Sequence, residues 1–175
     1  ATRALGLCDD RVGPARSQGA ALCLNGELLL SGLPAPLAGG YTPLPGGPVV
    51  PMERQSNAHF DMVGLELKDA YPPEAALMSL RRVVAFHRNT PRGWVELVDG
   101  VMFDGAAHTL EMRLVTPGKM ALATGVAVID GQRATLRVEY DPEQVAARIE
   151  PGAVVFAFAQ PRRSGAIRLK IEPVL

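Results

Sequence analysis

At 175 residues and 47% hydrophobic content, the chain is long enough and apolar enough to form one folded domain, which excludes broad disorder. Its 18 basic and 18 acidic side chains cancel, and this balance argues against a general electrostatic surface for nucleic acid or for a membrane. No stretch approaches the ~18 consecutive apolar residues that a membrane-spanning helix needs. The sequence opens at Ala1 without a signal peptide, which fits either a processed protein or a piece of a longer one.

The N-terminal third predicts short strands and one long loop. Residues 5–9 and 20–24 have the composition of strands, and Asn25-Gly26 between LCL and ELLL is a strong hairpin signal. Within residues 34–51, ten of the eighteen positions are proline or glycine. Such a segment forms neither a helix nor a central strand, so we expect a long surface loop.

Residues 59–88 predict two consecutive strands joined at the Pro72-Pro73 corner. In the first strand, His59 and Asp61 extend the row that the alternating apolar residues Val63, Leu65 and Leu67 form. The second strand is largely apolar on both faces after Arg82, as expected inside a packed sandwich.

The rest of the chain continues as strands separated by turns. We expect strands over residues 94–99, 101–103, 107–115, 120–129, 134–140, 154–159 and 167–171. One helix is expected over residues 141–150, because Asp141 can cap it, Pro142 suits its first position and Pro151-Gly152 ends it. About ten short strands at this spacing predict an all-β antiparallel sandwich with one short helix, formed by residues 1–175 as a single domain.

Two cysteines, Cys8 and Cys23, lie in apolar surroundings. Such residues are usually buried free thiols, and a disulfide between them is the alternative. The sequence has no CxxC motif and no cluster of cysteine with histidine, so it predicts no structural zinc site of that kind.

The three histidines are His59, His87 and His108. His59 and Asp61 are two apart on a strand and point the same way, while His87 lies on the following strand. If the strands pair, an imidazole–carboxylate–imidazole group could converge on a divalent metal such as zinc. Two alternatives stay open: one histidine contacts substrate or transfers a proton, or all are ordinary hydrogen-bonded histidines. His108 is expected to be exposed.

The remaining candidates for a ligand contact are Arg88, Arg92 and Tyr71. Arg88 and Arg92 flank a turn and can meet a carboxylate or a sulfate, with solvated charges and salt bridges as the alternative. Tyr71 offers its hydroxyl to a ligand or braces the Ala-Tyr-Pro-Pro corner.

No complete catalytic motif is present, because GxSxG, a Gly-rich phosphate loop and HExxH are all missing. A single tryptophan, Trp94, leaves little material for an aromatic sugar-binding platform. The residues therefore predict no catalytic group, and the candidate substrate contacts are His59, Asp61, Tyr71, His87 and Arg88.

Four stretches between about residues 22 and 116 carry a family resemblance by their order and spacing. They are Leu24-Asn25-Gly26-Glu27, Leu67-Lys68-Asp69-Ala70-Tyr71-Pro72, Leu80-Arg81-Arg82-Val83-Val84 and Val95-Glu96-Leu97-Val98-Asp99. Together they resemble the C-terminal β-sheet domain of the heparinase II/III-like polysaccharide lyases, which has an NG hairpin, an AYP corner, an R-x-V strand and a V-x-D strand.

The resemblance implies a function that depends on more than this domain. Full-length members join an α/α toroid to the β-sandwich and cleave acidic, glycosaminoglycan-like chains by β-elimination. The principal tyrosine, histidine and asparagine come mostly from the toroid. We therefore expect a domain that is inactive alone, packs on an N-terminal toroid, supports the cleft for an acidic polysaccharide, and belongs to a periplasmic or secreted protein. A homodimer is a further possible assembly.

The family sandwich also holds a metal through two histidines and a carboxylate, one histidine preceding the NG hairpin. Here Gly19-Ala20-Ala21 occupies that region, so no cofactor is expected. A zinc site would need Asp61 or Glu66 as the carboxylate and His87 as the second imidazole.

Two other functions stay open from the sequence. The chain could be a stand-alone, non-catalytic carbohydrate-binding or assembly module. Alternatively, it could be a small independent enzyme that uses His59, Asp61 and His87.

Overall fold

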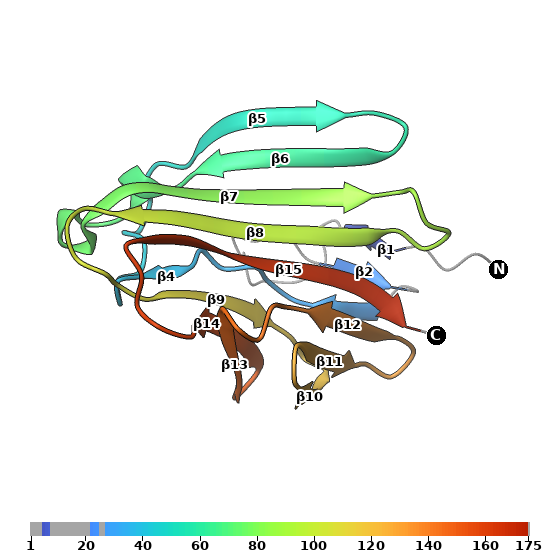
Figure 1. The fold of residues 1–175 in the computed structure, drawn as a ribbon. Coiled ribbons are helices and arrows are strands. Elements are labelled where there is room, and N and C mark those ends of the chain that lie inside the picture. Colours follow the sequence, from blue (N-terminus) through green and yellow to red (C-terminus); the bar gives the residue numbers. More distant parts are fainter. Residues whose placement is uncertain (1–4, 8–21, 25–26, 175) are drawn as a thin grey trace.

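A computed structural model describes residues 5–7, 22–24 and 27–174. The fold is all-β, with every named strand pair antiparallel, which confirms the predicted class. A large sheet packs against a smaller one, and a short N-terminal sheet lies beside them (Figure 1). The described residues contain no helix that is long and apolar enough to cross a membrane.

The large sheet has eight strands in the order β10-β11-β12-β15-β8-β7-β6-β5. Their bounds are β5 Val50–Ser56, β6 Phe60–Glu66, β7 Leu77–His87, β8 Trp94–Phe103, β10 Lys119–Ala123, β11 Val126–Asp130, β12 Thr135–Glu139 and β15 Ser164–Val174. Strands β5 to β8 are consecutive hairpins, so residues 50–103 form half of the sheet from one local stretch of chain. Every side chain of the edge strand β5 is exposed.

The smaller sheet has the order β13-β14-β9-β4. Its strands are β4 Leu37–Ala38, β9 Leu110–Val115, β13 Val145–Glu150 and β14 Ala153–Phe158. The third sheet contains β1 Leu5–Leu7, β2 Leu22–Leu24 and β3 Glu27–Leu30. The antiparallel β2–β3 pair agrees with the predicted hairpin, whose Asn25-Gly26 tip lies outside the described residues, as do Cys8 and the side chain of Cys23.

The inward faces of the two main sheets form one hydrophobic core. Because strand side chains alternate between faces, every second residue of β8 and β15 enters this core while its neighbours face outward. The small sheet contributes every second residue of β9 and β14 from the other side. Among the fully buried members are Leu97, Phe103, Leu110, Leu114, Phe156, Leu169 and Ile171.

The predicted helix over residues 141–150 is wrong, because this segment contains a turn followed by β13. The local helix-start signal is present: the Asp141 carboxylate accepts the backbone N–H of Glu143 at 2.9 Å, and the N–H of Val145 donates to the Asp141 carbonyl at 2.9 Å. The chain then pairs along its length with β14, and Val145 faces the core. Tertiary pairing therefore outweighs a helix signal that extends over a single turn.

Three further boundaries differ from the prediction. Residues 120–129 form two antiparallel strands, β10 and β11, because Gly125 adopts a φ of 74° and turns the chain. Asp99-Gly100 does not break β8, since this strand is paired on both sides with β7 and β15. The proline-rich loop over residues 34–51 contains β4 and runs into β5.

The predicted tight Pro-Pro connection is two short 3-10 helices, η1 Lys68–Ala70 and η2 Pro73–Ala75. They join the two long strands β6 and β7, which were expected from alternation. Ala76 ends η2 with a left-handed φ of 49° before β7 begins.

Candidate functional site

Three of the four stretches that carry the family resemblance meet inside the fold, through Tyr71, Arg82 and Asp99. Arg82 of β7 and Asp99 of β8 are directly opposite across the strand pair and point into the core. The guanidinium donates to both carboxylate oxygens, from Nε at 2.7 Å and from Nη2 at 2.6 Å. Its Nη1 also donates to the carbonyls of Leu33 and Pro34 at 2.8 and 2.9 Å. The pair therefore fastens the start of the long loop to the large sheet.

Tyr71, from the AYP corner, is also buried, with 5% of its surface exposed. Its hydroxyl donates to the carbonyl of Pro36, on the same loop that Arg82 holds. Burial, and secondly the charge of Asp99, raise the pKa of the Tyr71 hydroxyl above its ordinary range. Tyr71 thus braces the corner, as one of the two expectations had it, and does not reach a surface ligand.

Arg82 keeps its charge in this environment. Burial by itself lowers the pKa of Arg82, but the charge of Asp99 and its hydrogen bonds outweigh burial, so the net direction is upward. Tyr71, Arg82 and Asp99 therefore form a buried polar framework that holds the long loop against the large sheet.

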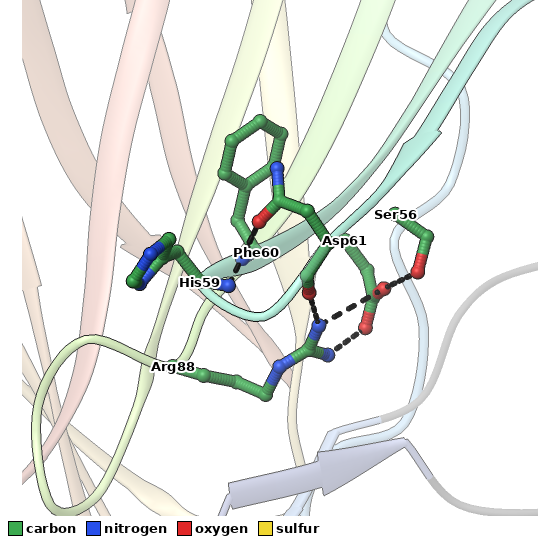
Figure 2. Close-up of polar contacts among 6 residues, drawn as sticks. Ser56, His59, Phe60, Asp61 and Arg88 are labelled. Carbon is green, nitrogen blue, oxygen red and sulfur yellow. Dashed lines mark hydrogen bonds and ion pairs between the residues drawn. The ribbon is translucent and has the colours of Figure 1, made fainter.

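A second polar group lies at the turns that end the large sheet. We call Ser56, Asn57, His59, Asp61 and Arg88 the turn cluster (Figure 2). The Asn57 side chain accepts the backbone N–H groups of His59 and Phe60 at 2.8 and 3.0 Å, which closes the β5–β6 turn. The backbone N–H of Arg88 donates to the carbonyl of His59 at 2.7 Å, so the β7–β8 turn is tied beside it.

The side chain of Arg88 reaches across to the neighbouring turn. Its guanidinium pairs with the Asp61 carboxylate and donates to the backbone carbonyl of Asn57. The Ser56 hydroxyl donates to the same carboxylate at 2.6 Å. The hydrogen bond from Arg88, followed by that from Ser56, lowers the pKa of Asp61. Asp61 is therefore a fixed anion that orients Arg88, rather than a general base.

Two further arginines lie on the strand and the turn that form this cluster. Arg54 lies on the exposed strand β5 opposite Val63, close enough for its charge to lower the pKa of Asp61. Arg92 lies in the same β7–β8 turn as Arg88. Arg88 and Arg54 thus act on the Asp61 carboxylate, and Arg92 follows Arg88 in the same turn. Guanidinium groups suit planar anions such as carboxylate and sulfate.

The expected convergence of His59, Asp61 and His87 does not occur. His87 pairs with Phe60 and Asp61 pairs with Phe86, and directly opposed residues in an antiparallel pair share a face. His87 therefore points to the opposite side of the sheet from Asp61. Convergence was one of the alternatives that the sequence left open, and the observed register excludes it, since a shift of one residue reverses the face that a side chain occupies.

These positions do not fit the metal that the family resemblance implies. The carboxylate alternative, Glu66, accepts the backbone N–H groups of Lys68 and Leu80 at 3.1 and 3.0 Å. Throughout the part of the chain that the structure describes, no group of three histidine, cysteine or acidic residues could hold a metal ion.

The other two histidines have distinct environments. His87 stacks on Trp94, with ring centroids 3.8 Å apart and an interplanar angle of 6°. His108 was expected to be exposed, but it is half-buried, and its ring lies 5.0 Å from that of Phe103. Its backbone pairs with Arg162, which holds the β8–β9 and β14–β15 connections together.

Two features of the site were missed from the sequence. The first is the Arg82–Asp99 pair, although a signal existed: both residues occupy core-facing positions in alternating strands, where an unpaired charge is costly. The second is Arg54, since strand β5 begins inside the proline-rich segment and carries no alternating apolar pattern. Only its pairing with β6 places Arg54 beside the turn cluster.

No protein family model matches this chain, and no curated protein matches it either.

Proposed function

We propose that the chain is the β-sandwich domain of a heparinase II/III-like polysaccharide lyase. In this proposal it supports one wall of the cleft for a uronic-acid-containing, glycosaminoglycan-like chain, and a neighbouring α/α toroid supplies the catalytic groups. The all-β fold and the buried contacts among three of the four resembling stretches are consistent with such a domain. β-Elimination needs the uronate carboxylate neutralised, a base for the C5 proton and an acid for the leaving oxygen.

The observation that carries the proposal is the presence of arginine side chains on the strand and the turn that form the turn cluster. Arg54 and Arg88 act on the Asp61 carboxylate, and Arg92 lies in the same turn as Arg88, in a chain whose formal net charge is zero. Asp61 holds Arg88 in place, so the side chain is already ordered before an anion arrives. In this proposal Arg54, Arg88 and Arg92 bind sugar carboxylates or sulfates. His59, which is exposed in the β5–β6 turn, contacts an uncharged group of the sugar.

The lyase role is tested by comparing this chain with a longer chain that contains it and the toroid. Both are incubated with uronic-acid polysaccharides, and the absorbance of the unsaturated product is followed. We expect product from the longer chain and none from this domain. Turnover by this domain alone would contradict the claim that the toroid supplies the catalytic groups. No product from either chain on any uronic-acid substrate would contradict the lyase assignment.

The binding role is tested on this domain alone. Arg54→Ser and Arg92→Ser should each weaken retention on an immobilised sulfated uronic-acid polysaccharide, with the double variant losing most retention at low salt, because each removes one ionic contact. Lys68→Ser is the matched control, since Lys68 lies on η1 beyond the other end of β6 and removes the same charge. Equal losses from Lys68→Ser would show non-specific attraction and contradict the assignment.

The second candidate function is a non-catalytic carbohydrate-binding or assembly module, which an exposed apolar row favours. Tyr41, Leu44, Val50 and Met52 are exposed along the loop and the edge strand β5. This candidate shares the polysaccharide contact but predicts no product from any longer chain. The turnover assay therefore separates the two.

A further inference from the structure

His87 lies on the outer face of the large sheet, the face away from the core. His87 belongs to β7, which pairs with β6 on one side and β8 on the other. The residues directly opposite it are Phe60 on β6 and Trp94 on β8. The ring stacks flat on Trp94, while the ring of Phe60 lies 6.0 Å away at 38°. Aromatic rings on both sides therefore hold the imidazole in one orientation.

The Nε2 atom of His87 is buried and has no hydrogen-bond partner among the described residues. The nearest acidic group is Glu96 of β8, whose Oε2 lies 4.0 Å from this nitrogen, beyond hydrogen-bonding distance. The two side chains are 22% and 23% exposed, so water screens their interaction only in part. A buried polar nitrogen without a partner is unfavourable, and here a carboxylate oxygen lies 4.0 Å away.

Glu96 is at present held by a different cation. Its Oε1 accepts Arg168 Nη1 of β15 at 2.5 Å. Lys170, also on β15, lies 5.8 Å above the Trp94 ring and pairs with Glu172 and Glu139. From β6, the outward neighbours Phe60 and Met62 carry no charge. The charged groups that face the stack are therefore Glu96, which favours a cation at His87, and Arg168 and Lys170, which oppose it.

We propose that His87 forms a contact with Glu96 on this face when its imidazole is protonated. When the imidazole takes up a proton, Nε2–H donates to Glu96, and the carboxylate becomes shared between His87 and Arg168. The Trp94 ring favours the same change, because the face of an indole attracts a cation. Histidine is the side chain that ordinarily changes charge between about pH 5 and 8, which makes this the interval in which the contact is tested. This inference does not depend on the proposed lyase role.

The single tryptophan makes the change directly measurable. An imidazolium accepts an electron from excited indole more readily than neutral imidazole does, so protonation of a stacked histidine quenches tryptophan emission. We expect the emission of the folded protein to fall along one sigmoid as the pH decreases from 8 to 5. His87→Phe keeps an aromatic ring against Trp94 without a proton site, and it should abolish the sigmoid. His59→Ala and His108→Ala are the matched controls and should preserve it.

Two charge variants test the role of Glu96. In Glu96→Gln the midpoint of the sigmoid should move to lower pH by about half a unit or more, because the attracting carboxylate is gone. In Arg168→Met it should move to higher pH, because the competing cation is gone. Far-UV circular dichroism at each pH shows that every variant stays folded across the titration.

Any of three results would overturn the proposal. These are emission that does not depend on pH, a sigmoid that persists in His87→Phe, or a midpoint that neither charge variant moves. If His87→Phe does not fold, the histidine ring signals in a proton–carbon correlation spectrum of the unaltered chain provide the same titration. A His87 signal that fails to shift with the Trp94 emission would then exclude the contact.

Discussion

At the scale of single residues, the most consequential feature is the buried pair of Arg82 and Asp99. Only 6% and 0% of these side chains are exposed, and Arg82 fills its remaining donors with loop carbonyls. A buried pair that is fully hydrogen bonded gives little net stability, but removal of one partner leaves the other charge uncompensated. The pair therefore matters more for holding one arrangement of the loop than for the size of the free energy of unfolding.

This reasoning predicts that Arg82→Met lowers the free energy of unfolding by about 3–5 kcal/mol, since it leaves Asp99 buried and unpaired. Arg81→Met, one residue away on the outer face, should change it by less than about 1 kcal/mol, because 61% of the Arg81 side chain is exposed. Urea denaturation measures both. The double variant Arg82→Met with Asp99→Leu should be more stable than Arg82→Met alone, and the opposite order would contradict the account.

Asp61 gives a residue-scale prediction in pH. Its pKa in the folded protein is lowered, first by the hydrogen bond from Arg88. A lowered folded pKa means that the contribution of the Asp61–Arg88 contact is present above the unfolded pKa of about 3.9 and is lost as the pH falls through the folded value. In Arg88→Met the Asp61 carboxyl should therefore titrate at a higher pH, nearer its ordinary range.

Carboxyl carbon chemical shifts followed by NMR from pH 6 to 2 measure this change. Arg92→Met, in the same turn, is the control and should leave the Asp61 titration almost unchanged. A titration of Asp61 that is identical in the unaltered chain and in Arg88→Met would show that the ion pair does not form in solution.

At the scale of elements, the β7–β8 turn positions Arg88 and Arg92, and Gly93 shapes it. Gly93 has a φ of 69°, and a Cβ there would lie 2.8 Å from the Phe86 ring and 2.9 Å from the His87 carbonyl. These contacts are too short for any side chain, and the carbonyl belongs to the paired strand and cannot move freely. The turn therefore requires glycine for two separate reasons.

Gly93→Ala should lower the free energy of unfolding by clearly more than the ~1–2 kcal/mol that a left-handed alanine costs. Gly46→Ala is the matched control, because Gly46 has a φ of 72° but nothing lies within 4 Å of its added Cβ. Denaturation midpoints of the two variants give the comparison. If both variants lose the same stability, the close contacts with Phe86 and His87 are not real constraints.

At the scale of the whole molecule, the two main sheets share one core. Leu97 enters it from β8 and Phe156 from β14, and both are fully buried. A core made jointly by two sheets cannot lose one of them and keep its packing. We therefore expect the described β-sandwich to unfold as one cooperative unit.

Leu97→Ala and Phe156→Ala should lower the free energy of unfolding by about 2–5 and 3–5 kcal/mol, respectively. Each should shift the transition seen by Trp94 fluorescence and the one seen by far-UV circular dichroism to the same extent, although Trp94 lies on the large sheet. Met52→Ala, on the exposed strand β5, is the control with little effect. Separate transitions for the two probes in Phe156→Ala would show that the sheets unfold independently.

Much of the fold was predictable because the relevant signals are local. Alternation in residues 60–66 and 77–87 marks strands within a few residues of the observed bounds, and Asp130-Gly131 marks the β11–β12 turn. Strand periodicity and turn chemistry act between neighbours in the chain, so the sequence can report them directly. Three of the resembling stretches contain Tyr71, Arg82 and Asp99, but only Tyr71 was a candidate ligand contact, and the burial of the three together was not predicted.

By itself, the sequence determined that this protein is built from antiparallel strands and where most of them turn. Tertiary structure alone decided the register that separates His87 from Asp61, the conversion of residues 145–150 into a strand of the small sheet, and the placement of Arg54 beside Arg88. The physical reason is the distance along the chain over which each signal acts. Alternation is a property of one strand, whereas a register or a choice of sheet depends on partners far along the chain, and a shift of one residue reverses which face a side chain occupies.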